Sequence, residues 1–340
     1  MILVTGGTGL VGAHLLYSFC QEGCKLRALY RNEERLKAAR KIFSYYTDDP
    51  DTCFSKIDWF RSDLLDIVSL HEAFDQITQV YHTAAIVSFD PADKARVIQN
   101  NVNGTANIVN LCLEKEIEKL CYVSSTSAIG PAPQGMLTDE GYIWSGGKQH
   151  TVYAESKFRS ELEVWRGIAE GLNAVIVNPS IIIGPGDWSR SSSYLFQRIW
   201  KGMNYYTNGV TGYVDIHDVI TVMSRLMRGD LTGERYIVSS ENLSYKEFFT
   251  MVAGALGKDP PARYASGFLT GLAWRLDWLI SKILRTERLL SKETVRASAA
   301  QVRFSNRKAI DATGVSFKSI DQSIQETAKI FLREMNERTG

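Results

Sequence analysis

The sequence has no excess of charge of either sign. Its 340 residues include 39 Lys and Arg against 38 Asp and Glu, a formal net charge of +1. The basic residues are scattered along the chain, whereas nucleic-acid-binding proteins gather them on one surface. The composition therefore does not favour a nucleic acid as partner, and we expect the chain to bind a small molecule instead.

Cysteine is also scarce. The sequence contains Cys20, Cys24, Cys53, Cys112 and Cys121, an odd number, and no two of them have the two-residue gap of a zinc knuckle. We therefore expect no metal site. The thiols are predicted to stay reduced and to fill gaps in an apolar core.

No leader and no uninterrupted membrane-spanning run is visible. The chain starts at Met1 with an apolar run rather than a charged leader, which favours a cytoplasmic location. Residues 267–290 are rich in Leu, Ile and Trp, but charged residues such as Arg275, Asp277, Lys282 and Arg285 interrupt them, and a spanning helix tolerates few such charges. We predict an amphipathic helix that lines the substrate side, with shallow membrane contact as the alternative.

The first half of the chain alternates short apolar runs with segments of helical periodicity. Ile2–Thr5 and Leu26–Tyr30 are typical of buried strands, and Leu10–Gln21 has the pattern of a helix between them. This alternation predicts an α/β fold with a Rossmann-type, doubly wound parallel sheet. Further strands are expected at residues 57–60, 79–84, 120–124 and 174–178, a helix at 33–45 and a polar loop at 47–55.

The alternation ends near residue 184. Gly, Pro and Ser accumulate up to residue 193, and helical patterns dominate after that. We therefore predict a first domain over residues 1–184 and a smaller, mostly helical C-terminal substrate lobe over 185–340. Apolar runs at 212–216 and 234–238 predict that the chain returns to the first domain near residues 212–240.

A glycine-rich turn separates the first strand from the first helix. Glycines there allow a tight turn and a close approach of a pyrophosphate to the backbone, and Gly12 lets the helix pack on the strand. The free N–H groups of the helix start then attract the anion. The turn therefore predicts a dinucleotide site with a Rossmann fingerprint. Its candidate cofactor-binding residues are Gly6, Gly9, Leu10, Val11 and Gly12.

The end of the second strand indicates which dinucleotide binds. An acid at this point accepts a hydrogen bond from the ribose of NAD, whereas an arginine accommodates the 2′-phosphate of NADP. No acid ends the strand, and Arg31 follows it directly. Arg31 therefore favours NADP(H), with NAD(H) as the alternative, although a solvated surface arginine would give the same pattern.

Tyr153 and Lys157 are four residues apart at the start of a predicted helix that runs to about residue 170. They share one helix face, and a nearby ammonium lowers the pKa of a phenol from its usual value near ~10. Tyr153 is therefore predicted to transfer a proton. Ser125 ends the fifth strand, at the sheet edge where open α/β sheets bind ligands. It is the candidate for holding a substrate oxygen, with Ser124 or Thr126 as alternatives.

Together these motifs resemble the extended branch of the short-chain dehydrogenase/reductase superfamily, the NAD-dependent epimerase/dehydratase family, and within it the dihydroflavonol 4-reductase-like proteins. The glycine turn fits the family's TGxxGxxG, and Tyr153 and Lys157 occupy its YxxxK positions. The resemblance implies that Ser125, Tyr153 and Lys157 are catalytic and that a homodimer is common. It also implies cofactor contacts for Asp63, Leu64, Ala84, Ala85, Asn101, Ser124, Lys157, Pro179, Ser180 and Ile182.

The departures from the family pattern narrow the activity. Sugar dehydratases carry an acid pair after their catalytic threonine, and Thr126-Ser127 stands there instead, which disfavours water elimination. We therefore predict an oxidoreductase that uses NADP(H) to reduce a carbonyl, or to oxidise the alcohol, of a small apolar or aromatic substrate. The alternatives are a nucleotide-sugar epimerase with tightly bound NAD, whose diphosphate Arg190 and Arg198 would bind, and a non-catalytic dinucleotide sensor. The aromatic lining is expected from Tyr264, Phe268, Leu269, Trp274 and Trp278.

Overall fold

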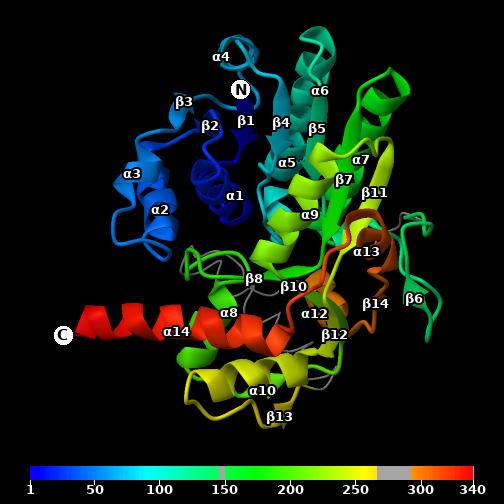
Figure 1. Ribbon diagram of the computed structural model, residues 1–340. Coiled ribbons are helices and arrows are strands. Elements are labelled where there is room, and N and C mark those ends of the chain that lie inside the picture. Colours follow the sequence, from blue (N-terminus) through cyan, green and yellow to red (C-terminus); the bar gives the residue numbers. More distant parts are fainter. Residues whose placement is uncertain (145–149, 266–291, 340) are drawn as a thin grey trace.

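A seven-stranded parallel sheet forms the centre of the first domain. The computed structural model describes residues 1–144, 150–265 and 292–339 (Figure 1). All neighbouring strands of the large sheet are parallel, in the order β11-β7-β5-β4-β1-β2-β3. The predicted Rossmann-type α/β fold is confirmed. The strands are β1 (Ile2–Thr5), β2 (Leu26–Tyr30), β3 (Asp58–Arg61), β4 (Gln79–His82), β5 (Lys119–Val123), β7 (Ala174–Pro179) and β11 (Glu234–Val238).

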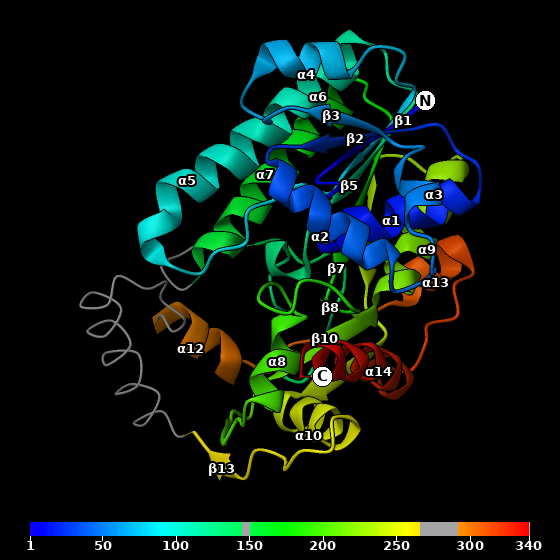
Figure 2. The same cartoon turned by 90° about the vertical axis from the view of Figure 1, so that its left-hand side faces the viewer.

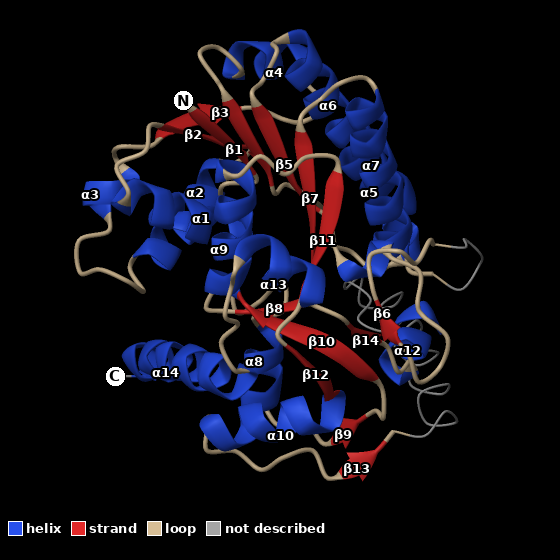
Figure 3. Ribbon diagram, turned by 45° about the vertical axis from the view of Figure 1, so that its right-hand side comes forward, coloured by secondary structure: helices blue, strands red, loops and turns tan. Residues whose placement is uncertain are grey.

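Helices cover both faces of this sheet (Figure 3). Because side chains alternate along a strand, Val4 points into one hydrophobic core and its neighbour Leu3 into the other. The first core lies under α1 (Leu10–Gln21), α2 (Glu33–Phe43) and α9 (Ile216–Arg228). The second lies under α4 (Ile67–Ala73), α6 (Gly104–Glu114) and α7 (Val152–Ala169). Between β4 and α6 the chain forms η1 (Pro91–Asp93), α5 (Lys94–Ile98) and the π-helix η2 (Gln99–Asn103).

The observed strands and helices of the first domain begin and end close to the predicted positions. The predicted loop at residues 47–55 differs, because it contains the short helix α3 (Asp51–Phe54). Arg40 of α2 donates to both carboxylate oxygens of Asp51, at 2.6 Å each, and so joins the two helices. This pairing across eleven positions of sequence is not visible in the local polar pattern.

The C-terminal lobe contains a small sheet as well as helices. Strands β8 (Ile181–Ile183), β10 (Val210–Asp215) and β12 (Glu241–Ser244) form it in the order β12-β10-β8. Tyr213 of β10 stacks on Phe248 at a centroid distance of 4.3 Å. Both rings belong to a third hydrophobic core, separate from the two cores of the large sheet. Around this sheet lie α8 (Tyr194–Trp200), α10 (Tyr245–Ala255) and α14 (Ile320–Thr339).

The two predicted returns of the chain behave differently. The segment at 234–238 joins the large sheet as β11, beside β7. The segment at 212–216 forms a strand, but it pairs with β8 and β12 rather than with the large sheet. Its apolar residues find a parallel partner in Ile181–Ile183, which lies outside the large sheet. Helix α9, directly after it, returns to the first domain and packs against α1, β5 and β7.

Helix α14 also joins the lobe to the first domain. Figure 2 shows it passing below α1 and α2. Glu334, 6% exposed, accepts hydrogen bonds from the Tyr45 hydroxyl at 2.5 Å and from the Trp188 indole at 3.0 Å. It also forms an ion pair with Lys41 of α2. A buried carboxylate with several donors therefore fastens the C-terminal helix to α2 and to the loop after β8.

Short elements complete the described chain. They are η3 (Thr126–Ala128), α12 (Lys292–Ala299), α13 (Arg307–Thr313) and the strand pairs β6 (Leu137–Thr138) with β14 (Arg303–Phe304) and β9 (Tyr205–Tyr206) with β13 (Arg263–Tyr264). Across residues 1–144, 150–265 and 292–339, no helix is both long and apolar enough to span a bilayer. The same ranges hold no group of three potential metal ligands. The predicted amphipathic helix at 267–290 lies outside the described residues, as do Phe268, Leu269, Trp274 and Trp278.

Candidate active site

The glycine turn between β1 and α1 leaves room for an anion at the helix start. Gly6 has φ +68°, in the left-handed region that favours glycine. A Cβ on Gly12 would lie 2.3 Å from the carbonyl oxygen of Gly6, so no larger residue fits there. Helix α1 follows Gly9 without a side-chain cap, and the N–H groups of Leu10 and Val11 have no partner within the helix. The turn therefore fits a dinucleotide pyrophosphate.

The loop after β4 packs against this turn. A Cβ on Gly6 would lie 2.7 Å from the backbone nitrogen and from the Cα of Ala84. The Ala84 N–H also donates to the Thr5 hydroxyl at 3.3 Å. Ala84 and the adjacent Ala85, both candidate cofactor contacts, are therefore close to the glycine turn.

Asn101 holds this loop in place from η2. Its Oδ1 accepts from the Ile86 N–H at 2.8 Å, and its amide donates to the Ile86 carbonyl at 2.9 Å and to the Ser156 hydroxyl at 3.0 Å. Asn101 is 3% exposed, and its amide is engaged on both sides. Its side chain therefore acts on the candidate cofactor site through the loop.

Beneath the turn, His82 is buried in a chain of hydrogen bonds. The Thr5 hydroxyl donates to Nδ1 at 2.6 Å, and Nε2 lies 3.0 Å from the Thr105 hydroxyl. Because Thr105 gives its own proton to the Asn101 carbonyl at 2.6 Å, it can only accept from Nε2. This pattern assigns the neutral tautomer with the proton on Nε2. Burial, aided by the charge of Lys157, lowers the pKa of His82 to about 3.

We expect the protein to lose folding stability when the pH falls below about 6.5, the unperturbed histidine value. Burial lowers the pKa of His82 to about 3 and that of His14 to about 4, so the folded state resists protons that the unfolded chain takes up. Burial also raises the pKa of Asp218 to about 6, which opposes part of the loss. The free energy of unfolding should fall by roughly 2 kcal/mol between about pH 7 and about pH 5.

Urea unfolding at the two pH values measures this difference. His71→Ala is the control, because His71 is half exposed and pairs only with surface charges such as Glu114. That variant should show the same loss as the parent protein. A free energy of unfolding that stays constant over this interval would contradict the proposed burial of neutral histidines.

Tyr153 and Ser125 are brought together as candidates for the reacting groups. Ser125 Oγ accepts from the Ser127 N–H at 3.2 Å and from the Ser127 hydroxyl at 3.0 Å. With both lone pairs used, its own proton is left for the Tyr153 oxygen, to which it is hydrogen-bonded. Burial raises the pKa of Tyr153 to about 12, and the bond from Ser125 opposes that rise.

Lys157 lies one turn after Tyr153 on the same face of α7 and is 3% exposed. Its Nζ donates to the Val123 carbonyl at 2.8 Å and lies 5.1 Å from the centre of the Tyr122 ring. Burial lowers the pKa of Lys157 to about 7. The ammonium is thus directed at the end of β5. Lys157 was predicted to lower the pKa of Tyr153, but the group that lowers it in the structure is Ser125.

Arg31 lies at the other end of the candidate cofactor site, between β2 and η2. Its Nη1 is 3.6 Å from Oδ2 of Asp63 and donates to Oδ1 of Asn100 at 3.3 Å. Leu64, the neighbour of Asp63, packs so closely on Gly104 that a Cβ there would lie 2.8 Å from it. The structure therefore brings Arg31 and Asp63 together, and it places Leu64 against α6.

Two further arginines lie near Arg31, and the sequence pattern did not associate them with it. Burial and the positive charge of Arg190 lower the pKa of Arg35, and Arg31 contributes in the same direction. Arg35 comes from the first turns of α2, whereas Arg190 belongs to the loop after β8 and pairs with Asp187 at 3.7 Å. Only the packing of that loop on α2 reveals this positively charged surface.

The remaining candidates follow β5 and β7. The Ser180 N–H donates to the Val238 carbonyl at 3.0 Å, and Ser180 is 8% exposed. Pro179 ends β7 and Ile182 lies in β8, so this stretch carries the chain from the large sheet to the lobe. The Ser124 hydroxyl is already used, because it donates to Glu161 at 2.6 Å.

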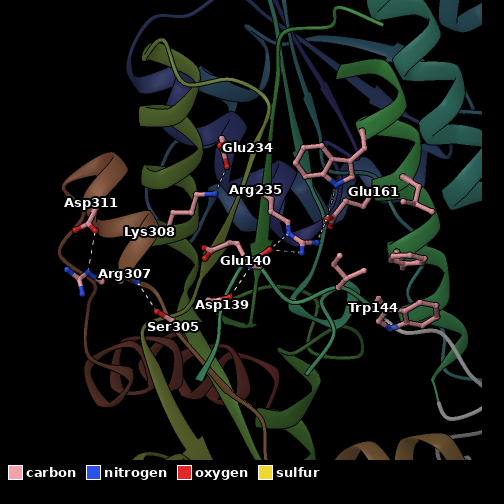
Figure 4. A pocket seen from close by; sticks show the side chains of 15 residues that line it. Asp139, Glu140, Trp144, Glu161, Glu234, Arg235, Ser305, Arg307, Lys308 and Asp311 are labelled. Carbon is pink, nitrogen blue, oxygen red and sulfur yellow. Dashed lines mark hydrogen bonds and ion pairs between the residues drawn. The ribbon is translucent and has the colours of Figure 1, made fainter. Parts of the chain in front are cut away.

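A pocket of about 840 Å³ opens on the other side of α7 (Figure 4). None of the candidate cofactor-binding or reacting residues lines it. Several of its charged groups are paired with one another, among them Arg235 with Glu161 at 2.9 Å and Lys308 with Glu234 at 2.5 Å. Sequence reasoning missed Glu161, although its position four residues after Lys157 continues the Tyr153–Lys157 spacing along one helix face.

The parallel sheet is of the Rossmann type, and its glycine turn fits a pyrophosphate. The helix that carries Tyr153 and Lys157 lies at the carboxyl edge of this sheet. These features define an NAD(P)-dependent enzyme of the extended short-chain dehydrogenase/reductase type. The chain belongs to the NAD dependent epimerase/dehydratase family, which it matches over residues 2–239.

Curated relatives extend this similarity. A protein of Synechocystis sp. named "Putative dihydroflavonol 4-reductase" is 29% identical over 96% of this chain and 93% of its own length. Sterol demethylase protein B of Methylococcus capsulatus is 28% identical over 76% of this chain and 75% of its own. Cinnamoyl-CoA reductase 1 of Petunia hybrida is 25% identical over 72% of this chain and 73% of its own.

Solved structures share the whole architecture. The crystal structure of gox2253 superposes with a TM-score of 0.80 at 26% identity, covering 98% of each chain. A UDP-glucose 4-epimerase from Thermotoga maritima, solved with UDP-glucose, has a TM-score of 0.76 at 17% identity, covering 98% of this chain and 99% of its own. The second likeness concerns the fold alone.

Proposed function

We propose that this protein is an NADP(H)-dependent oxidoreductase that reduces the carbonyl group of a small apolar or aromatic compound, or oxidises the corresponding alcohol. The observation that carries the proposal is the hydrogen bond between Ser125 and Tyr153 at the carboxyl end of β5, with Lys157 one turn away. Reductases among the relatives, such as cinnamoyl-CoA reductase 1 of Petunia hybrida, support the direction and the substrate class.

The proposed mechanism divides the reaction between cofactor and protein. NADPH, held at the glycine turn of Gly6, Gly9 and Gly12, would supply the hydride for the carbonyl carbon. Tyr153 and Ser125 hold the carbonyl oxygen, and Tyr153 gives it a proton, so that an alcohol results. With its pKa raised to about 12 by burial, Tyr153 keeps that proton at neutral pH until the oxygen gains charge. The Ser125 hydroxyl, which donates to the Tyr153 oxygen, then stabilises the phenolate left behind, and Lys157 holds a positive charge one helical turn away.

The preference for NADP rests on the positively charged surface beside β2. Arg31 is 56% exposed at its side chain, with Arg35 and Arg190 near it. A phosphate with nearly two negative charges suits the planar donors of such arginines. Arg31 pairs with Asp63 at 3.6 Å and Arg190 with Asp187 at 3.7 Å, but both pairs are exposed and weak, so their guanidinium groups can turn to a phosphate.

We expect Arg31→Ala to raise the KM for NADPH by at least about tenfold, the loss of roughly one charge-assisted hydrogen bond. The KM for NADH should stay the same, because NADH lacks the 2′-phosphate. Lys37→Ala, on the exposed face of α2, is the matched control and should change neither value. Steady-state kinetics with both cofactors measures the effect. An equal loss with NADH and NADPH would contradict a 2′-phosphate contact.

Cofactor analysis of the purified protein separates the alternatives. The proposed reductase should bind NADPH reversibly and leave little nucleotide in the protein after purification. NAD released in stoichiometric amount on denaturation would favour a nucleotide-sugar epimerase instead. Tight NADP binding without turnover on a broad panel of carbonyl compounds and alcohols would favour a dinucleotide sensor.

A further inference from the structure

Glu161 is a buried acid next to the candidate reacting groups. It lies one turn beyond Lys157 on α7, so Tyr153, Lys157 and Glu161 project from one face of the helix. Its side chain is only 3% exposed. Burying a carboxylate is costly unless hydrogen bonds and an opposite charge compensate it. Its partners therefore indicate what it does.

One carboxylate oxygen of Glu161 holds the ends of two strands. Oε2 accepts from the Ser124 hydroxyl at 2.6 Å and from the Asn178 amide at 2.8 Å. The same Asn178 amide nitrogen donates to the carbonyl oxygen of Ser125 at 3.0 Å. Glu161 is thus linked to Ser125 in two ways: through Ser124, which precedes Ser125 at the end of β5, and through Asn178 at the end of β7, which bonds the Ser125 carbonyl.

The other oxygen is bound to β11. Oε1 accepts from Nη1 of Arg235 at 2.9 Å and from the Trp165 indole at 3.3 Å. Figure 4 shows Arg235 beside Glu161 and Glu140. Arg235 also donates to the carbonyl oxygens of Glu140 and Tyr142, at 2.7 and 2.8 Å. The ion pair with Arg235 offsets part of the cost of burying the Glu161 carboxylate.

The charge of Glu161 also acts on Lys157. Burial lowers the pKa of Lys157 to about 7, and the carboxylate opposes that fall. Among the residues that the structure describes, the other groups facing Lys157 supply no negative charge to replace that of Glu161. His82 is neutral because its pKa lies at about 3, and Tyr122 offers only its ring. Tyr153 keeps its proton at neutral pH because its pKa is raised to about 12.

We propose that Glu161 is a positioning residue for this reaction: it holds Ser125 in place through Ser124 and Asn178, and it keeps a negative charge one helical turn from Lys157. The proposal rests on the proposed function, since it assigns Glu161 a role only through residues that would contact the substrate. It goes beyond that function because Glu161 itself touches neither substrate nor cofactor.

Glu161→Gln tests both parts, because glutamine keeps the shape but carries two N–H donors and no charge. All four partners of Glu161 approach it as donors, so either amide orientation sets donor against donor. Asn178 could relieve this on its side by turning its buried Oδ1, which has no hydrogen-bond partner among the described residues, toward the glutamine. It would then lose its bond to the Ser125 carbonyl.

In the Glu161→Gln enzyme we expect kcat to fall at least about tenfold, while the dissociation constant for NADPH changes less than about twofold. The alkaline limb of the pH profile of kcat/KM, which reports Lys157 in the free enzyme, should move to lower pH by about one unit. The matched control is Glu163→Gln, a partly exposed acid on the same helix that pairs with Arg166 at 3.0 Å. It should leave kcat and the pH profile unchanged.

Ser124→Ala keeps the test decisive if Glu161→Gln does not fold. It removes one hydrogen bond but leaves the carboxylate charge, so kcat should fall severalfold with the alkaline limb in its original place. A Tyr153→Phe enzyme measured alongside separates the two proposals. If Tyr153→Phe is inactive but the folded Glu161→Gln enzyme keeps a normal kcat and pH profile, the positioning role alone is overturned. A normal kcat in Ser124→Ala beside an inactive Tyr153→Phe has the same consequence. An active Tyr153→Phe overturns the proposed function as well.

Discussion

Tyr153→Phe should lose nearly all reductase activity, with kcat reduced by about 10²- to 10⁴-fold, the usual contribution of a positioned general acid. The variant removes the only proton that the proposed mechanism gives to the substrate oxygen, and it leaves Ser125 with no phenol to bond. The ring itself remains and keeps its edge contact with Phe89 at a centroid distance of 5.8 Å. The fold and the dissociation constant for NADPH should therefore stay close to those of the parent enzyme.

Single-turnover and steady-state assays with NADPH measure this loss, and fluorescence titration measures cofactor binding. Tyr205→Phe is the matched control, because Tyr205 is 46% exposed on β9 and belongs to none of the candidate groups. It should retain normal kcat. A Tyr153→Phe enzyme with at least about half of the parent kcat would remove the proposed acid from the mechanism.

Gly12→Ala should abolish cofactor binding, with the dissociation constant for NADPH raised at least about 100-fold. The added methyl group would lie 2.3 Å from the Gly6 carbonyl oxygen and 2.9 Å from the Gly7 Cα. Both atoms belong to the backbone, so no side-chain rotation relieves the overlap and the turn itself must open. The N–H groups at the start of α1 would then lose the arrangement that receives a pyrophosphate.

Gly254→Ala provides the comparison for this substitution. Gly254 lies within α10, where an added Cβ would have no atom within 4 Å. Alanine there should leave cofactor binding unchanged and should raise the free energy of unfolding by up to about 1 kcal/mol, because it favours the helix. Isothermal titration with NADPH and thermal unfolding check both variants. Equal NADPH binding by Gly12→Ala and the parent would place the pyrophosphate elsewhere.

The elements of the first domain were predictable because their patterns are local. The run Ile2–Thr5, the glycine turn and the helix Leu10–Gln21 carry hydrophobic periodicity and turn residues that specify each element without distant partners. The spacing of Tyr153 and Lys157 similarly placed both side chains on one helix face. These parts of the fold and site follow from the order of residues alone.

Contacts between distant segments supplied the rest. Whether 212–216 joins the large sheet depends on which strand is free to pair with it, and Ile181–Ile183 provides that partner. The environment of Lys157 likewise depends on the Val123 carbonyl, which no local pattern places beside it, and on the burial that lowers its pKa. Burial and charge from such packing determine the pKa values of the site, because desolvation and Coulomb interactions act through space rather than along the chain.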